Sequence, residues 1–176
     1  MNRQTNKVGE VAYLSLGSNL GDRAANLCEA IGLLHEADSV QTVSSFYETQ
    51  PFEAPDQSWF LNCVLGLETE KTPRELLKFV LSLEEGMGRL RMRAKGPRKI
   101  DIDIVLFGER TADDPDLKIP HPDMHRRRFV LEPLAEIAPE ARHPILGKTA
   151  DELLAALPPG QSVRRLDSQP GPGAGK

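Results

Sequence analysis

Residues 100–104 alternate isoleucine with aspartate and are followed by three more apolar residues, which limits the conformations that this segment can adopt. Successive side chains of a β-strand point to opposite faces of a sheet. In a strand, Asp101 and Asp103 would therefore share one face. The opposite, core-facing side would carry Ile100, Ile102, Ile104 and Leu106. The alternation predicts a strand over residues 99–108 that is buried on one side and acidic on the other.

The two carboxylates lie one pleat repeat apart, so they repel each other unless a cation lies between them. Hard oxygen ligands suit Mg²⁺, which usually takes one or two carboxylates and completes its coordination with water and phosphate oxygens. The alternative is a half-exposed strand with a solvated acidic face, although aspartate is disfavoured in strand interiors. The pair alone leaves both interpretations open.

Basic residues cluster before and after this strand in a chain whose formal net charge is −4. One run lies in residues 89–99, and a second is Arg126, Arg127 and Arg128. Arginine forks bind phosphate oxygens bidentately, while a metal ion neutralises part of the charge of a polyphosphate. The first run therefore fits a metal-chelated nucleotide, although a solvated basic loop or an RNA contact would have the same composition. The net negative charge counts against general nucleic-acid binding.

Three further features bear on chemistry. Glu84 falls in the last turn of a predicted helix, where the helix dipole disfavours a carboxylate. Three explanations fit this position: Glu84 binds a ribose hydroxyl, pairs with an arginine, or is simply exposed. His121 stands between two prolines and fits a phosphate or ribose contact better than a metal site, because the histidines lack zinc-ligand spacing. The turn at residues 17–21 lacks the ending of a P-loop, but its glycines could let the backbone approach a flat ligand.

The order of predicted elements defines the fold class. Strands are expected at residues 11–17, 40–49, 60–68 and 99–108, and helices are expected after the capping residues Asp22 and Thr72. This order of strand, helix, strand, strand, helix and strand is that of the ferredoxin-like βαββαβ core, an α+β fold. In this core a mainly antiparallel sheet is covered by helices. Helical additions should follow at residues 130–137, interrupted by Pro133, and from Thr149. We expect one domain over residues 11–158, a disordered extension at 1–10 and a disordered tail at 159–176.

The compartment is expected to be the cytoplasm. The first residues are polar and lack the apolar region of a signal peptide, and no stretch has the apolar length of a membrane span. Cys28 and Cys63 have no metal-ligand spacing and are expected to be reduced core thiols.

Four segments, taken together, resemble the 6-hydroxymethyl-7,8-dihydropterin pyrophosphokinase family, and they stand in the same order as in that family. They are residues 13–21, residues 44–49 with 60–62, residues 96–107 and residues 119–131. The third is the most specific, because Gly-Pro-Arg followed by two aspartates alternating with apolar residues is the family's signature. The resemblance covers most of the chain.

The resemblance implies transfer of pyrophosphate from ATP to the hydroxymethyl group of the pterin, with release of AMP, in tetrahydrofolate biosynthesis. Asp101 and Asp103 would coordinate two Mg²⁺ ions that bridge the triphosphate. Arg89 and Arg98 would stabilise the transferring group. The expected partners are these small molecules, with no nucleic acid, no membrane and a monomeric state.

The same resemblance assigns the remaining site residues. The ATP contacts would be Glu84, Arg91, Ile104, His121 and Arg127. The pterin pocket would use Thr49, Gln50, Phe52, Phe60, Asn62 and Phe129. Some relatives carry a pterin-covering tryptophan where this chain has Lys95, and a proline where it has Gln50.

Two other functions fit parts of the pattern. Ferredoxin-like sheets also bind RNA, but such modules stack bases on aromatic residues in central strands, and here the best exposed strand presents two aspartates. A kinase or nucleotidyltransferase with another acceptor would share the metal and phosphate residues. Asn62 and Phe129 favour a pterin, because an amide can both donate to and accept from its edge.

Overall fold

The computed structural model of the chain describes residues 9–51, 56–88 and 96–167. Its main sheet has the strand order β5-β1-β4-β3-β8, and β2 also pairs with β4. These strands are β1 (Glu10–Ser18), β2 (Ser39–Val43), β3 (Tyr47–Thr49), β4 (Phe60–Thr69), β5 (Asp101–Phe107) and β8 (Val163–Arg165). The helices are α1 (Arg23–Ala37), α2 (Pro73–Gly86), α3 (Arg128–Ile137), α4 (Ala150–Ala155) and the short 3₁₀ helix η1 (Met124–Arg126).

The predicted ferredoxin-like core is confirmed. All pairings in the main sheet are antiparallel. Both β2 and β3 pair with β4, so they are two parts of the second strand of the βαββαβ unit, interrupted at residues 44–46. The four-strand core therefore has the order fourth, first, third, second. A separate hairpin of β6 (Ala112–Asp114) and β7 (Leu117–Ile119) follows β5.

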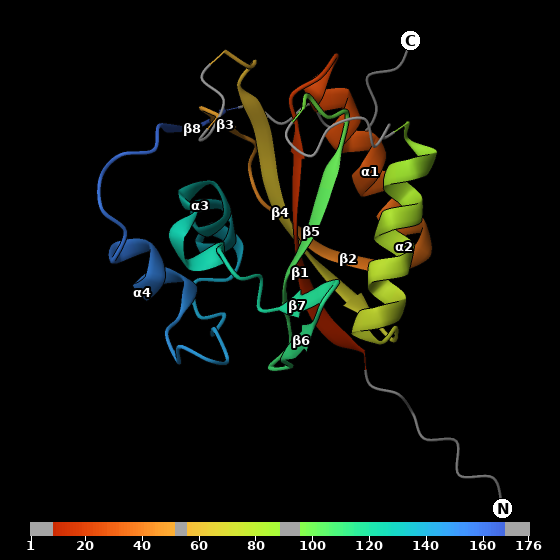
Figure 1. The fold of residues 1–176 in the computed structure, drawn as a ribbon, viewed down its shortest axis with the longest axis vertical. Coiled ribbons are helices and arrows are strands. Elements are labelled where there is room, and N and C mark those ends of the chain that lie inside the picture. Colours follow the sequence, from red (N-terminus) through yellow and green to blue (C-terminus); the bar gives the residue numbers. More distant parts are fainter. Residues whose placement is uncertain (1–8, 52–55, 89–95, 168–176) are drawn as a thin grey trace, which may run out of the picture.

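Each face of the sheet carries its own hydrophobic cluster. Helices α1 and α2 lie on one side of the sheet, and α3 and α4 lie on the other (Figure 1). The first cluster joins Leu27, Leu76 and Leu65 from α1, α2 and β4. The second joins Val64 and Val105 in the strands to Leu131 in α3. The sheet is thus the central layer, and the α3 side is the one that Asp101 and Asp103 share.

The helix starts follow from local sequence. Thr72 and Glu75 form the predicted capping box of α2, and the Asp22 side chain caps α1 by accepting from the backbone of Ala25. The interruption expected at Pro133 is absent, because α3 continues through it. Pro133 is itself buried among neighbours that pack on the sheet, and this packing offsets the missing backbone donor.

The sequence predicts the correct side of the sheet for the aspartates of β5 and the wrong side for one residue, Leu106. Ile102 and Ile104 lie in the first cluster, as expected. Leu106 lies instead in the second cluster, beside Val105. The register against β1 shifts between Tyr13 and Leu14, which leaves Val105 as an extra residue in β5. Such a β-bulge reverses the facing of the residues beyond it.

Part of the segment expected to be a disordered tail is ordered. Strand β8 pairs with β3, and Leu166 packs against the first cluster. At the other end, Glu10 already belongs to β1. Within the described ranges, the structure has no helix of the length and hydrophobicity needed to cross a membrane.

Candidate active site

One row of residues crosses the sheet on the α3 side. Asp101 lies opposite Gly17 in β1, Gly17 lies opposite Asn62 in β4, and Asn62 lies opposite Tyr47 in β3. Residues directly opposite in neighbouring strands project from the same face. Strands are spaced by about 4.8 Å, so Asp101 and Asn62 are separated by about 10 Å across the row. The predicted metal residues and the predicted pterin residue therefore share one surface.

Gly17 allows the Asn62 side chain to approach the backbone of β1 closely. A Cβ atom at this position would lie 2.6 Å from Oδ1 of Asn62 and 3.8 Å from Cδ1 of Phe60. Those contacts also place Phe60 beside Asn62, on the face predicted by alternation. The sequence predicts that the glycines of residues 17–21 let the backbone approach a flat ligand. In the structure Gly17 lies within β1 and accommodates the Asn62 side chain, and glycine inside a strand is a known sign of close approach.

Asp101 and Asp103 lie in different electrostatic surroundings. Asp101 pairs with Arg98, whose Nη1 lies 3.0 Å from Oδ2. Burial, followed by the charge of Asp101, raises the pKa of Asp103 to about 7, and Glu84 adds to this effect. The positive charges of Arg127 and Arg98 act in the opposite direction. A carboxylate held this way is stabilised by any cation that binds beside it.

The donor set fits a magnesium ion. In the described part of the chain, His, Cys, Asp and Glu side chains nowhere gather in a group of three or more that could hold a metal. A cation bound by Asp101 and Asp103 would therefore take its other ligands from water or from a bound polyphosphate. Mg²⁺ in nucleotide sites usually has this coordination.

Glu84 and His121 both reach the outer edge of β5. Glu84 is buried in α2, and its Oε1 accepts a hydrogen bond of 2.6 Å from the backbone of Ile102. The backbone of His121 donates to Val105 at 3.0 Å. These contacts satisfy backbone groups that an edge strand would otherwise leave unpaired. They also bring two predicted ATP contacts beside the aspartate strand.

Arg127 lies between the predicted metal and pterin residues. Its guanidinium is 5.6 Å from the centroid of the Phe129 ring, a cation–π contact, and its charge acts on Asp103. Burial and the charge of Arg127 lower the pKa of His121, which is therefore neutral at pH 7. The backbone of Asp123 donates to Nδ1 of His121 at 3.1 Å, which leaves Nε2 as the N–H.

The predicted pterin wall is closely hydrogen-bonded. Nδ2 of Asn62 donates to Oγ1 of Thr49 at 2.6 Å, and both side chains are buried. Gln50, which is exposed, donates through its backbone to Ser162 at 3.3 Å. Gln50 also lines a hollow of about 460 Å³ together with Pro51, Arg126, Arg128 and residues 157–161.

One predicted ATP contact, Ile104, points away from this surface. The side chain of Ile104 packs in the first cluster, so only its backbone could contact a nucleotide. Arg89, Arg91, Phe52 and Lys95 lie outside the described residues.

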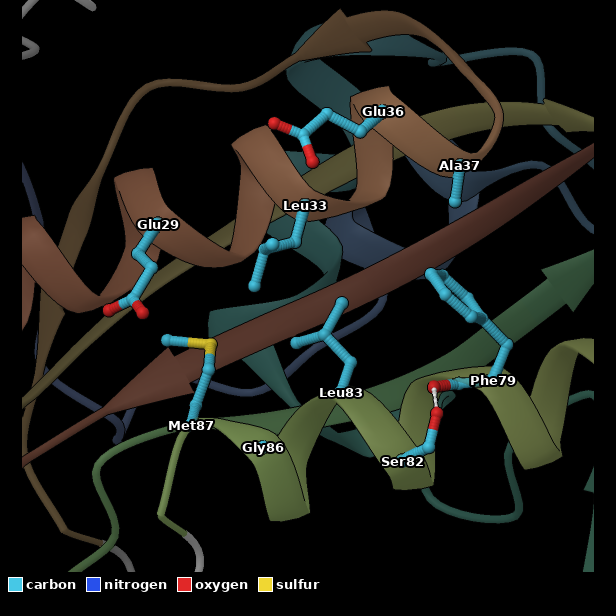
Figure 2. A pocket seen from close by; sticks show the side chains of 9 residues that line it. All are labelled: Glu29, Leu33, Glu36, Ala37, Phe79, Ser82, Leu83, Gly86 and Met87. Carbon is cyan, nitrogen blue, oxygen red and sulfur yellow. Dashed lines mark hydrogen bonds between the residues drawn. The ribbon is translucent and has the colours of Figure 1, made fainter.

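A second hollow lies on the opposite side of the sheet, between α1 and α2. Figure 2 shows Leu33, Leu83, Phe79 and Met87 pointing into it, with Glu29 and Glu36 along α1. Its volume is about 580 Å³. The predicted site residues are absent from the described residues that line it, so it is separate from the aspartate–asparagine surface.

Comparison with known proteins gives one consistent family. The sequence profile of the 7,8-dihydro-6-hydroxymethylpterin-pyrophosphokinase (HPPK) family matches residues 13–139. A 2-amino-4-hydroxy-6-hydroxymethyldihydropteridine pyrophosphokinase of Methylorubrum extorquens is 45% identical over 158 residues, which cover 89% of this chain and 98% of that protein. The Bacillus subtilis protein of the same name is 41% identical, over 82% of this chain and 88% of the relative.

Longer proteins contain a similar segment. A folic acid synthesis protein of Dictyostelium discoideum is 37% identical over 94% of this chain, which spans only 25% of that protein. The solved structure of wild-type Plasmodium falciparum HPPK-DHPS with SDX-DHP has a TM-score of 0.69 and 18% identity, and it shares the fold over 86% of this chain and 45% of its own. With the profile match spanning most of the described sheet, the chain belongs to the 7,8-dihydro-6-hydroxymethylpterin-pyrophosphokinase family.

Proposed function

We propose that this chain transfers pyrophosphate from ATP to the hydroxymethyl group of 6-hydroxymethyl-7,8-dihydropterin, releasing AMP, as a step of folate biosynthesis. Family membership supports this activity. The observation that carries the proposal is the row across the sheet, in which Asp101 and Asn62 face the same side with Gly17 between them. A phosphate-binding group and an acceptor-binding group at this separation suit a transfer between two bound substrates.

The phosphate side of the site is the metal half, which we define as Arg98, Asp101 and Asp103. These aspartates would hold Mg²⁺, which supplies charge neutralisation on the triphosphate when bound. Arg98 is anchored beside them by its contact with Asp101 and can donate to phosphate oxygens. His121, whose backbone pairs with β5, and Arg127, whose charge acts on Asp103, would contact the nucleotide, and Glu84 supports the strand edge.

The pterin side is the acceptor half, which we define as Thr49, Asn62 and Phe129. Asn62 offers an amide to the pterin edge, and Thr49 fixes that amide. Phe129 provides a ring for stacking and lies next to Arg127, so the bound pterin would be close to the transferring group. Phe60 and Gln50, with Phe52, would complete the wall.

The transfer itself breaks one bond and forms one. The hydroxymethyl oxygen attacks the β-phosphorus in line and gives up its proton to solvent. The bond from that phosphorus to the oxygen that bridges the α- and β-phosphates breaks, and AMP leaves with this oxygen. Arg98, together with Arg89, would stabilise charge on the phosphoryl oxygens, and the acceptor half would hold the attacking oxygen in position. Positioning and charge stabilisation provide most of the catalysis in reactions of this kind. We retain a monomeric state and a cytoplasmic location as predictions.

A coupled assay of AMP release tests the proposal. Protein, ATP and Mg²⁺ are incubated with and without 6-hydroxymethyl-7,8-dihydropterin, after circular dichroism has established that the protein is folded. We expect AMP only when the pterin is present, in a one-to-one ratio with the pterin consumed. Release of ADP instead would indicate a simple kinase, and no pterin-dependent AMP from folded protein would contradict the proposed function.

A further inference from the structure

Glu136, near the end of α3, makes a group of contacts that the reaction scheme does not use. Its Oε1 accepts from the backbone and the hydroxyl of Ser45, at 3.0 and 2.8 Å. Its Oε2 accepts from the hydroxyl of Tyr47 at 2.5 Å. Arg165, in β8, lies 3.6 Å from Oε1 and donates to Oγ of Ser45 at 3.0 Å. We refer to Glu136, Ser45, Tyr47 and Arg165 as the Glu136 clasp.

The clasp joins three elements that are far apart in the sequence. Ser45 lies in the interruption between β2 and β3, Tyr47 is in β3, Glu136 is in α3 and Arg165 is in β8. The carboxylate accepts three donors, which is close to its full capacity. Burial, followed by the hydrogen bond to Glu136, raises the pKa of Tyr47, so the hydroxyl remains a donor over the whole physiological range.

Two of the elements that the clasp joins, β3 and α3, carry residues of the acceptor half. Tyr47 lies directly opposite Asn62, and Thr49, which fixes the Asn62 amide, is two residues further along β3. At the other end of α3, Phe129 lies seven residues before Glu136, about 10 Å along the helix axis. The distance between the Asn62 amide and the Phe129 ring therefore depends on how α3 sits against β3.

We propose that Glu136 is a positioning residue, which acts through Tyr47 and Ser45 to fix the spacing between Asn62 and Phe129 and thereby sets the affinity for the pterin. The inference rests on the proposed function, because it assigns the pterin to this half of the site. It concerns residues that contact neither the substrate nor the transferring phosphate. A contact with that role affects binding of the acceptor and leaves binding of ATP unchanged.

The test compares Tyr47→Phe with Tyr13→Phe. Tyr47→Phe removes only the hydroxyl of the clasp, and we expect the KM for the pterin to rise about tenfold, because a hydrogen bond to a charged group is lost. The kcat and the KM for ATP should change less than about twofold. Tyr13→Phe removes a hydroxyl from β1, where the ring packs against the second cluster outside the clasp, and should leave all three constants unchanged.

A double-mutant cycle separates positioning from general destabilisation. Glu136→Ala removes the carboxylate, and with it the group that accepts from Tyr47 and from Ser45. The variant carrying both Glu136→Ala and Tyr47→Phe should therefore have the same pterin KM as Glu136→Ala alone. If the clasp were merely structural, the melting temperature would fall while the pterin KM stayed at the wild-type value, and that result would overturn the proposal.

Hydrogen exchange provides a measurement that does not depend on activity. In Tyr47→Phe, the amides of β3 and of the first turn of α3 should exchange faster than in the wild type, whereas those at the β1–β5 pairing should not. Unchanged exchange in β3 and α3 would contradict the proposal even if the wild-type protein released no AMP. Failure of the proposed function alone would instead give a wild-type protein without pterin-dependent AMP release and with the expected exchange difference.

Discussion

The acceptor half and the metal half lie on the same face of one sheet, but they are held in different ways before any substrate binds. Asn62 is buried and fixed by Thr49, and the Glu136 clasp connects the strand of Thr49, β3, to α3. Burial, followed by the negative charges of Asp101 and Glu84, raises the pKa of Asp103. The acceptor half is therefore preformed, while the metal half is under electrostatic repulsion that a cation would relieve. The difference predicts that substitutions in the two halves alter different kinetic constants.

The largest effect is expected for Asp103→Asn. The substitution keeps the size of the side chain but removes the charge that would bind Mg²⁺, so kcat/KM should fall by at least about 10³-fold. The fold should remain intact, because an unfavourable buried charge is lost. Steady-state AMP release measures the effect, with Asp113→Asn as the control, since Asp113 is exposed in the β6–β7 hairpin. Retained activity would remove Asp103 from the metal half.

The next largest effect is expected for Arg98→Ala. Arg98 pairs with Asp101 and is proposed to stabilise charge that develops during transfer, so kcat should fall by about 10²-fold while the pterin KM changes little. Steady-state kinetics with ATP and with the pterin as the varied substrate distinguishes a role in the transfer step from a role in ATP binding. A variant in which only the KM for ATP rises would show that Arg98 contributes ground-state binding.

Gly17→Ala should affect the acceptor half alone. The added Cβ would meet Oδ1 of Asn62 at 2.6 Å, so the amide must turn away, and we expect the pterin KM to rise about tenfold. Gly32→Ala is the matched control, because a Cβ there has no neighbour within 4 Å and alanine favours the helix. Calorimetric titration with the pterin would measure the change. Equal pterin affinities in the two variants would contradict the proposed position of Asn62.

A smaller effect is expected from removal of β8. A chain ending at Gln161 loses the strand that pairs with β3 and the Arg165 contact of the clasp, so its pterin KM should rise about threefold. A chain that ends at Asp167 keeps β8 and serves as the control. The ratio of the two pterin KM values checks the prediction, and a ratio of one would show that β8 has no part in arranging β3.

Much of the fold could be predicted from local sequence. Alternation in residues 60–68 and 99–104 gives the correct faces for Asn62 and both aspartates, and Thr72 with Glu75 marks the start of α2. Leu106 was assigned to the wrong face because a bulge depends on the register between two strands, which one strand does not encode. Strand β8 was missed because its three residues are ordered by pairing with β3 and by packing of Leu166.

The site was predictable where residue type determines the chemistry. Carboxylates, arginines and an amide could be named as candidates, and the structure places Asp101, Arg98 and Asn62 on or beside one surface. Glu136 is not predicted, and Gly17 is predicted only as a place where the backbone could approach a ligand, because the neighbours of both residues come from other elements. Asn62 approaches Gly17 only when the strands of the sheet are paired. Ser45 and Tyr47 contact Glu136 only when α3 has packed on the sheet.

The most direct test of the contrast between the halves is the melting temperature of the metal-free protein at pH 5 and pH 8, with and without Mg²⁺. The folded-state pKa of Asp103, about 7, is above its usual value, so the folded state holds this proton more tightly than the unfolded state. Asp103 therefore contributes stability at low pH that is lost as the pH rises from about 4 to about 7.

Because the lowered pKa values of His121 and His143 act in the opposite direction, the effect of Asp103 is read against Asp103→Asn, in which both histidines are unchanged. Between pH 5 and pH 8 the melting temperature of the wild type should fall relative to that of Asp103→Asn, and Mg²⁺ should raise it again at pH 8 by binding the folded state. Asp103→Asn should show no response to Mg²⁺, whereas Gly17→Ala should respond to pH and to Mg²⁺ as the wild type does. A wild-type protein that is insensitive to Mg²⁺ at pH 8, or an Asp103→Asn protein that Mg²⁺ still stabilises, would contradict the account.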